Sequence, residues 1–382
     1  MNPMLVFQDV PVVPVTRVIR VKGNGGPAWP DFDRQVTARF CRNGVPSDWK
    51  PEVPVRMQPV AGSAVWGGFL VPQFGHLAAE SVTRLPQSLH ERPDDLYLFT
   101  VPPGGSAGTV PGYAWAVLDW MGLPRTQVHI VTEPVMIREL RVAPQGEMLG
   151  KLPTDPAYLD LLDVIARKRL PAVRATGTVF VTRSGMVAKG QGGHAGEGYL
   201  AAALAQAGVR VMDPGQVSLR DQMAAYAGAE TLVFSEGSAL HGRCLLGRLP
   251  QDIHVLRRRS RRDTARLQLQ ARCQTLSYVE ALTDSLGAAR RGLHSRPHLA
   301  VALYDLDQVF RLFSRIGIDL SRHWDGAAYR DAIRQDIESW MVRAQLSPEQ
   351  RDRNLRLLRR HRLLVDPVPA TPAAPAATAT PT

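Results

Sequence analysis

Short apolar strands alternate with helix-forming segments in the second half of the chain, and this alternation narrows the possible folds more than any other feature. Residues 178–182, 209–212 and 231–234 are predicted strands because they are short apolar runs. The segments between them, 198–207 and 218–227, are predicted helices. Strands that alternate with helices form parallel sheets covered on both faces. The sequence therefore predicts an α/β fold.

The first half of the chain shows the same alternation. Strands are predicted at 64–71, 95–101 and 128–132, with a helix at 113–122. Residues 1–60 are predicted to form edge strands and loops. Because 382 residues exceed the usual size of one core, we expect more than one domain.

Changes in composition along the chain suggest where the domains begin and end. The predicted parts are an N-terminal α/β domain over 1–150, a connecting helix over 151–173, a second α/β domain over 174–256, a basic and mostly helical extension over 257–365, and a disordered tail rich in Pro, Ala and Thr over 366–382. Within the extension, residues 276–286 and 299–316 are predicted helices, although 298–304 fits a strand equally well.

The net charge of +11 is concentrated in arginine-rich segments at 257–272 and 351–362. A solvated surface is the favoured interpretation of these clusters. Peripheral contact of the second segment with an anionic membrane stays open, because its arginines alternate with leucines. No zinc-finger spacing and no RNP-type pattern accompanies the charge, so no nucleic-acid partner is expected.

Several features favour a cytoplasmic chain. No apolar run reaches the roughly 18 residues that span a bilayer, and the N-terminus has no basic segment before its apolar part. The cysteines, Cys41, Cys244 and Cys273, are odd in number and far apart, which favours free thiols. Their spacing is not that of metal ligands, and no metal is expected.

The first candidate site lies on a helix predicted to begin near residue 74 or 75. His76, Glu80 and Arg84 are four residues apart, so the helix would present them on one face. A helix N-terminus disfavours an imidazolium, which would keep His76 neutral and able to accept a proton. A solvated face with a Glu–Arg pair is an equally good interpretation of the spacing alone.

The second candidate site is the turn that follows the strand at 231–234. The strand stops at Ser235-Glu236-Gly237-Ser238, and a helix begins at Ala239. Backbone N–H groups at such a turn suit an anion such as a diphosphate, and Glu236 could accept hydrogen bonds from sugar hydroxyls. His241 follows on the same helix. An ordinary capped turn is the plainer alternative.

Three further polar residues follow the strands of the second half. Arg183 comes directly after 178–182, Lys189 lies in the glycine-rich loop that follows, and Asp213 ends the strand at 209–212. Ligands of parallel sheets bind beyond the carboxyl ends of the strands, so we expect these residues near the turn at 235–241. The loop is predicted to be mobile and to cover a substrate. Its G-x-G-x-x-A pattern starts too far from the strand for a dinucleotide site.

These motifs together resemble those of the family 61 glycosyltransferases, which include bacterial capsular-polysaccharide biosynthesis proteins. The matching residues are Gly75-His76 with Glu80, Thr182-Arg183, Asp213-Pro214 and Glu236 to His241. The resemblance covers residues 66–256 and implies a GT-B fold, with two Rossmann-like domains facing a cleft. It also implies inverting transfer from a nucleotide-sugar without an essential metal. Ser184 departs from it, because many relatives have a second basic residue there.

An inverting transfer requires a base for the acceptor hydroxyl and cations or dipoles for the leaving diphosphate. The base is assigned to His76, with Glu80 orienting it or acting as the base itself. The predicted donor-binding residues are Arg183, Lys189, Asp213, Glu236, Gly237, Ser238, Ala239 and His241. The expected partners are a UDP-linked sugar and a glycan or lipid-linked glycan acceptor, with no cofactor. A non-catalytic nucleotide-sugar-binding scaffold and a nucleotide-dependent oxidoreductase remain alternatives.

Overall fold

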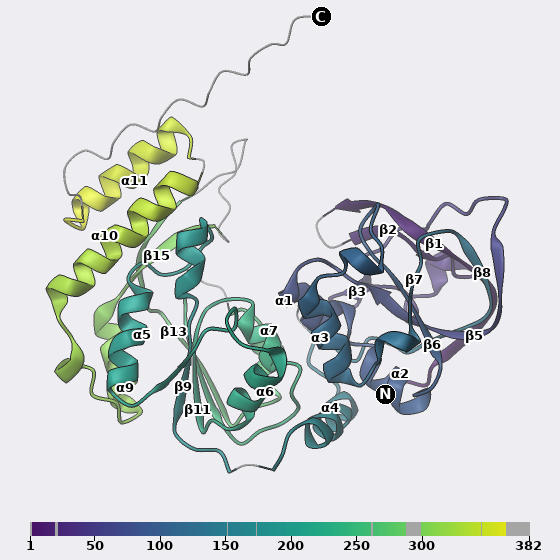
Figure 1. Ribbon diagram of the computed structural model, residues 1–382, viewed down its shortest axis with the longest axis horizontal. Coiled ribbons are helices and arrows are strands. Elements are labelled where there is room, and N and C mark those ends of the chain that lie inside the picture. The colour runs from purple at the N-terminus through teal and green to yellow at the C-terminus, as the bar shows by residue number, and fades with distance from the viewer. Residues whose placement is uncertain are drawn as a thin grey trace, which may run out of the picture. The chain divides into compact units, whose positions relative to one another are not determined.

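The structure is a computed structural model of the chain, and it describes residues 2–19, 22–150, 152–172, 174–260, 263–287, 299–344 and 346–363. The chain divides into two compact units, each built from segments that are distant in sequence. Unit 1 contains Met1–Val181, Gln216–Val255 and Asp263–Tyr278, and unit 2 contains Thr182–Gly215, Leu256–Arg262 and Val279–Thr382. The fold is mixed α/β with several sheets (Figure 1), as the alternation of strands and helices predicts. The domain boundaries inferred from composition stay predictions.

A six-stranded mixed sheet forms the N-terminal part of unit 1 (Figure 1). In their spatial order the strands are β2 (Lys22–Pro27), β1 (Leu5–Ile19), β8 (Val135–Val142), β5 (Gln58–Phe69), β6 (Leu96–Thr100) and β7 (Val128–Ile130). β1 pairs antiparallel with both β2 and β8. The remaining pairs, β8 with β5, β5 with β6 and β6 with β7, are parallel. The strands predicted between residues 64 and 132 are confirmed.

The prediction that residues 1–60 supply only edge strands is wrong, because β1 lies inside the sheet between β2 and β8. Pro11 and Pro14 favoured an edge position, since proline cannot donate to a ladder. The strand accommodates them with irregularities. Asp9 has a φ of 50° where the pairing with β8 skips a residue, and the register with β2 shifts between Val13 and Arg17. Residues 36–39 form turns and a bend that lead into the short pair β3 (Cys41–Arg42) and β4 (Val45–Pro46).

The segment after β5 is a broken helix. It consists of α1 (Phe74–His76), a π-helical turn over Leu77–Ser81 and α2 (Leu85–Glu91). The amide of Val82 donates to the carbonyl of Leu77 at 3.2 Å, which is the i→i+5 bond of a π-helix. One continuous α-helix was the simpler expectation. The α3 helix (Gly112–Met121) confirms the helix predicted between β6 and β7.

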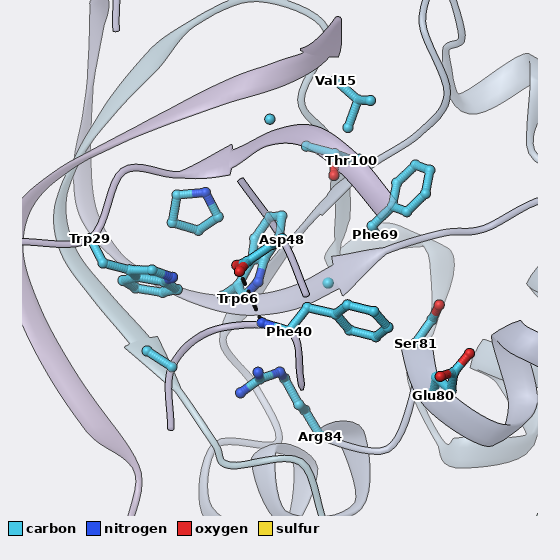
Figure 2. A pocket seen from close by; sticks show the side chains of 15 residues that line it. Val15, Trp29, Phe40, Asp48, Trp66, Phe69, Glu80, Ser81, Arg84 and Thr100 are labelled. Carbon is cyan, nitrogen blue, oxygen red and sulfur yellow. Dashed lines mark hydrogen bonds between the residues drawn. The ribbon is translucent and has the colours of Figure 1, made fainter. Parts of the chain in front are cut away.

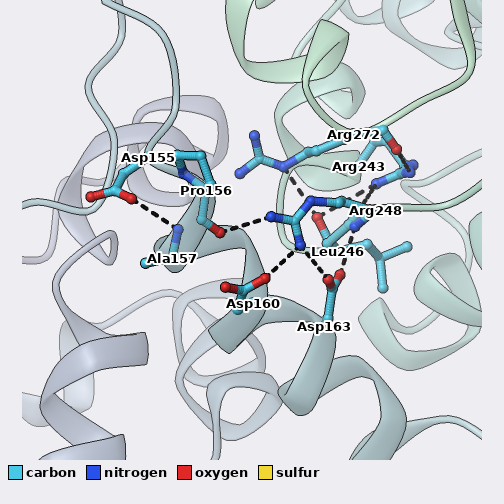
Figure 3. A network of polar contacts seen from close by, with 10 residues as sticks. Asp155, Pro156, Ala157, Asp160, Asp163, Arg243, Leu246, Arg248 and Arg272 are labelled. Atoms are coloured by element: carbon cyan, nitrogen blue, oxygen red, sulfur yellow. Dashed lines mark hydrogen bonds and ion pairs between the residues drawn. The ribbon is translucent and has the colours of Figure 1, made fainter. Parts of the chain in front are cut away.

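The segment predicted as a connecting helix does contain a helix, α4 (Pro156–Arg169), and Asp155 caps it by accepting from the amide of Ala157 at 2.8 Å. Its connecting role stays a prediction. Figure 3 shows the arginines that hold α4 to the segment around residue 246. Arg248 donates to Asp160 and Asp163, each at 2.8 Å. Arg272 is fully buried, forms an ion pair of 2.9 Å with Glu147 and donates to the carbonyl of Leu246. These contacts tie together segments of unit 1 that lie about a hundred residues apart in the sequence.

Unit 1 also contains a run of neighbouring strands from the second half of the chain. In order these are β9 (Thr178–Val181), β11 (Thr231–Ser235), β12 (Asp252–Leu256) and β13 (Thr275–Val279). β9 and β11 pair in parallel, with Phe180 opposite Val233. The helices α6 (Leu219–Ala227), α7 (Ala239–Arg243) and α8 (Arg266–Gln270) accompany them. Ser218 caps α6 by accepting a hydrogen bond from the amide of Asp221, at the start of the helix predicted over 218–227.

Unit 2 begins with a 3-10 helix over Ser184–Lys189 and contains α5 (Glu197–Gln206), β10 (Arg210–Met212), the antiparallel pair β14 (Leu282–Leu286) and β15 (Val301–Tyr304), and the helices α9 (Leu306–Arg315), α10 (Gly326–Arg343) and α11 (Pro348–Arg360). Its core packs α10 and α11 against the hairpin, around the fully buried Trp340. The helix predicted at 276–286 is wrong, because this segment supplies β13 and β14. Of the two interpretations of 298–304, the strand is correct from Val301.

The C-terminal helix α11 begins with a capping box formed by Ser347 and Gln350. Its leucines at 355, 357 and 358 pack in the core of unit 2, which leaves arginines such as Arg353 and Arg356 exposed. The predicted disordered tail at 366–382 lies outside the described residues. No helix within the described ranges is long and apolar enough to cross a membrane.

Candidate active site

A buried carboxylate with two basic partners marks the centre of the candidate site in unit 1. Glu80 is only 1% exposed. Arg42 holds it with two hydrogen bonds, from Nε to Oε1 and from Nη2 to Oε2, each 2.5 Å long. The Nδ1 atom of His76 lies 2.7 Å from Oε2 of Glu80 and 3.0 Å from Nη2 of Arg42. Three side chains from two distant segments therefore form one hydrogen-bonded group.

The proton on His76 decides what this group can do. An arginine only donates hydrogen bonds and an ionised glutamate only accepts them. When Nδ1 carries the proton it donates to Glu80, and Nε2 then has a lone pair that can accept a proton from a hydroxyl. The side chain of His76 is about one-third exposed (33%), whereas that of Glu80 is buried. This is the arrangement of a general base oriented by a carboxylate.

The pKa of Glu80 shows which interaction dominates its environment. Burial by itself would raise the pKa of this carboxyl, but the hydrogen bonds from His76 and Arg42 and the charge of Arg42 outweigh it, so the pKa is lowered from its usual value. Glu80 is therefore ionised at neutral pH and suited to stabilise a protonated His76.

The predicted stripe of His76, Glu80 and Arg84 is wrong in its third member. Arg84 is 3% exposed and donates to the main-chain carbonyls of Thr37, Arg39 and Ala143. The π-helical turn adds a residue between Glu80 and Arg84, so a spacing of four no longer keeps them on one face. Arg84 instead fixes the N-terminal segment from which Arg42 reaches Glu80.

The second candidate site lies beside the first, and Gly75 explains how. A Cβ atom at Gly75 would lie 3.0 Å from Cδ2 of His241 and 3.3 Å from Cβ of Ser238. Only glycine allows α1 to approach the turn at 235–241 this closely without displacement. Phe74 likewise packs at 3.4 Å from the position of a Cβ at Gly242. The structure therefore brings together His76, Glu80, Gly237, Ser238, Ala239 and His241, which all belong to unit 1.

Glu236 has a more enclosed environment than the sequence suggests. It is fully buried, and its Oε1 accepts a hydrogen bond of 2.7 Å from Thr264. The main-chain carbonyl of Thr264 accepts in turn from the hydroxyl of Tyr278 at 2.6 Å. The helix that follows, α7, is only five residues long. Because the dipole of so short a helix is small, an anion at this turn would depend mainly on individual N–H groups.

The remaining predicted donor-binding residues belong to unit 2. Arg183 donates from Nε to the carbonyl of Gly192 at 3.0 Å, and its main-chain amide donates to the buried Glu197. Lys189 is exposed at the end of the 3-10 helix. Asp213 accepts from the amide of Gly215 at 2.8 Å, and its Oδ2 lies 3.3 Å from the position of a Cβ at Gly185. Asp213 and the start of the 3-10 helix are therefore close neighbours.

The loop at 184–198, predicted to be mobile and to cover a substrate, is closely packed within unit 2. Its first part is helical, and His194 and Ala195 are fully buried. The ring of His194 stacks on Tyr304 with centroids 3.9 Å apart, and the amide of Gly196 donates to Asp336 at 2.8 Å. Glycine suited this segment because it packs closely against α10: a Cβ at Gly196 would lie 2.6 Å from the ring of Tyr329.

The segment that contains most of the candidate site matches a known family. Residues 74–246 match the family model described as Glycosyltransferase 61. The match begins at the first residue of α1 and ends just after α7. The enzymes of that family transfer a sugar from a donor to an acceptor. No curated protein matches the chain.

Two residues of the site lie outside the segment that matches Glycosyltransferase 61. Arg42 precedes the segment and Thr264 follows it. Neither residue is singled out by a motif, since an isolated arginine in a loop and an isolated threonine carry no pattern of their own. The short hairpin of β3 and β4 places Arg42, and the α8 region places Thr264. Within the described ranges, no group of three or more His, Cys, Asp and Glu residues could hold a metal ion.

Proposed function

We propose that this protein is an inverting glycosyltransferase that moves a sugar from a UDP-linked donor to a glycan acceptor without a metal. The observation that carries the proposal is the oriented His76. Its Nδ1 is hydrogen-bonded to a buried, charge-paired carboxylate 2.7 Å away, and Gly75 brings it next to the turn at 235–241. The match of residues 74–246 to Glycosyltransferase 61 supports the reaction class.

In the proposed reaction, Nε2 of His76 accepts the proton of the acceptor hydroxyl. The hydroxyl oxygen forms a bond to the anomeric carbon of the donor as the bond between that carbon and the diphosphate oxygen breaks, and the electron pair leaves with UDP. Attack from the face opposite UDP inverts the anomeric centre. Glu80 stabilises the imidazolium that forms, and Arg42 keeps Glu80 ionised and in place. A positioned base of this kind contributes about 10²–10⁴-fold in rate.

The proposed donor site contains the turn at 235–241. The amides of Ser238 and Ala239 would bind the diphosphate, with Gly237 allowing close approach and His241 adding a polar contact. Arg183, Lys189 and Asp213 remain proposed donor ligands. A donor hydroxyl at Glu236 would compete with the hydrogen bond that Thr264 donates to Oε1. A GT-B arrangement of two Rossmann-like domains is part of this proposal.

The acceptor in this proposal is a glycan or lipid-linked glycan of bacterial surface polysaccharide synthesis, made in the cytoplasm. The exposed arginines of α11 would allow peripheral contact with an anionic membrane. Because its leucines are packed in the core, this contact would be electrostatic only. It predicts that sedimentation with vesicles containing phosphatidylglycerol falls sharply between about 0.1 and 0.5 M salt, because the Debye length shrinks from about 10 Å to about 4 Å over this range. Salt-independent sedimentation, or none at low salt, would refute it.

A non-catalytic sugar-nucleotide-binding scaffold is the second candidate function. It is favoured by the enclosed position of Glu236, which a structural role explains as well as a donor contact does. A scaffold would bind UDP-sugars without ever releasing UDP. A scaffold would not need the lone pair of a partly exposed His76 next to the buried carboxylate of Glu80.

The decisive experiment incubates the protein with a panel of UDP-sugars and acceptor oligosaccharides and measures free UDP and product. We expect UDP release with one donor, slow with water and faster with an acceptor. Thermal shift with the same panel reports binding, since a ligand that binds the folded state raises the melting temperature. Binding without UDP release would support the scaffold, and neither binding nor release would refute both functions.

A further inference from the structure

A pocket opens in unit 1 where two parallel strands end, and no role has yet been assigned to it (Figure 2). Phe69 is the last residue of β5 and Thr100 the last residue of β6, and both line the pocket. β5 and β6 are parallel neighbours. Ligands of such sheets bind beyond the carboxyl ends of the strands. The pocket therefore has the position of a ligand site.

The wall of the pocket is largely aromatic. Trp29, Phe40, Trp66 and Phe69 surround it (Figure 2), and Phe69 and Phe40 are only partly buried, which leaves access from that side. The space open to the centres of water molecules is about 50 Å³, several times the ~10–15 Å³ that one water needs. A sphere of this volume has a radius of about 2.3 Å, and adding the radius of a water molecule gives a cavity radius of about 3.7 Å. One six-membered sugar ring has about this radius.

One polar group in the pocket lacks a partner. Thr100 is 1% exposed, and its Oγ1 has no hydrogen-bond partner among the residues that the structure describes. Thr100 lines the pocket together with Phe69, its register partner on β5 (Figure 2). A buried hydroxyl without a partner is unfavourable, so native proteins rarely retain one without a reason. A ligand hydroxyl in the pocket would supply the missing hydrogen bond.

The charge pairing and the size of the pocket limit the ligands that it can hold. Asp48 and Glu80 line it, and Asp48 is held by Arg39 at 2.8 Å and by the amide of Phe40 at 3.3 Å. Arg84 also lines the pocket, but its guanidinium is bound to main-chain carbonyls. Each of the two carboxylates is paired with an arginine, Asp48 with Arg39 and Glu80 with Arg42, while carboxylate oxygens can still accept hydrogen bonds from sugar hydroxyls. The pocket therefore suits an uncharged, hydroxylated ring, and its volume of about 50 Å³ is too small for a whole nucleotide.

Glu80 connects the pocket to the candidate base. It lines the pocket and accepts a hydrogen bond from Nδ1 of His76. Ser81, the next residue, lines the pocket as well, and the carbonyl of Ser81 lies only 3.1 Å from the position of a Cβ at Gly68. The π-helical turn therefore packs closely against β5, and Glu80 both lines the pocket and contacts the imidazole of His76.

We infer that this pocket binds one uncharged sugar ring of the acceptor glycan, with the apolar face of the ring on the tryptophans and one hydroxyl on Thr100. The inference rests on the proposed function, because only a glycosyl transfer makes the bound sugar an acceptor. Pockets of this kind combine an aromatic wall with a few placed polar groups, which fix the orientation of the ligand.

The test measures binding of methyl glycosides by saturation-transfer NMR. The panel comprises the glycosides of glucose, galactose, mannose, N-acetylglucosamine and rhamnose. The test variant is Thr100→Val, which keeps the shape of the side chain and removes the hydroxyl. The matched control is Ser88→Ala: Ser88 is also fully buried, its hydroxyl also lacks a partner among the described residues, and it lies on α2 outside the pocket lining.

We expect at least one glycoside to bind the wild type and Ser88→Ala equally, and to bind Thr100→Val about 3- to 10-fold more weakly, as loss of one neutral hydrogen bond implies. UDP should not displace the glycoside. The inference is overturned if no glycoside binds, if Thr100→Val binds as well as the wild type, or if UDP competes. UDP binding in the absence of glycoside tests the proposed function separately, so the pocket inference and the proposed function can fail independently.

Discussion

At the scale of single residues, the site is governed by one buried carboxylate. Glu80 lies against Arg42 and His76 in a place where an unpaired charge would be strongly unfavourable. The sequence predicts Glu80 and His76 as partners because their spacing of four is a local property. Arg42 could not be predicted, since it lies 38 residues upstream and its approach depends on a hairpin with no recognisable signal. The residues that orient a catalytic group are thus the harder part of a site to predict.

The lowered pKa of Glu80 has a consequence for stability at acid pH. A carboxyl whose pKa is lowered by folding stabilises the folded state above its unfolded pKa, near 4.5, and this contribution is lost as the pH falls through the folded pKa. The difference in unfolding free energy between the wild type and Glu80→Gln should therefore shrink as the pH falls from 6 towards 3. Urea titrations of both proteins across roughly this range measure it. A difference that stays constant or grows in acid contradicts the assignment.

At the scale of elements, the site depends on the close approach of α1 to the turn at 235–241. Local patterns predict both elements, and the structure confirms the strand and helix on either side of each. Their contact is set by tertiary packing. The π-helical turn could not be predicted from the sequence. The change of hydrogen bonds from i→i+4 to i→i+5 between Leu77 and Val82, which are both buried, has no signature in the pattern of apolar residues. The helix predicted at 276–286 is wrong because the apolar residues of a short segment can fit the period of a helix as well as that of a strand.

Gly75 tests this contact. Gly75→Val would place side-chain carbons against His241 and Ser238, so we expect a loss of about 1–3 kcal/mol in unfolding free energy and a lower transfer rate. The control is Gly112→Val at the start of α3, where a Cβ would have no neighbour within 4 Å. Its effect should be within about 0.5 kcal/mol. Equal effects of the two variants on stability and rate would show that the contact does not exist in solution.

At the scale of the whole molecule, buried arginines join distant segments of unit 1. Arg272 contacts Glu147, Thr154 and the carbonyl of Leu246 (Figure 3 shows it beside Arg243). The alternation of strands and helices predicted the α/β class, but not that residues 263–278 fold with the first 181 residues. Such an assignment depends on pairings over more than a hundred residues, which local patterns do not encode.

Arg272→Met should destabilise the protein by about 3–5 kcal/mol, because it leaves Glu147 buried without its ionic partner. Removing both charges with Arg272→Met and Glu147→Leu should recover much of this loss. Arg248→Ala serves as the comparison, since its ion pairs are about 40% exposed on the arginine side and should matter by about 1 kcal/mol or less. Denaturant midpoints measure all three. A loss for Arg272→Met no larger than for Arg248→Ala would contradict the account.

The central claim is that His76, oriented by Glu80, is the base of a glycosyl transfer. The most direct measurement is the rate of acceptor-dependent UDP formation by the wild type and by His76→Ala, together with the affinity of each for UDP. The account predicts that His76→Ala lowers the rate by about 10²–10⁴-fold and leaves UDP affinity within about twofold. A variant that keeps the full transfer rate would show that another group removes the proton and that His76 is not the base.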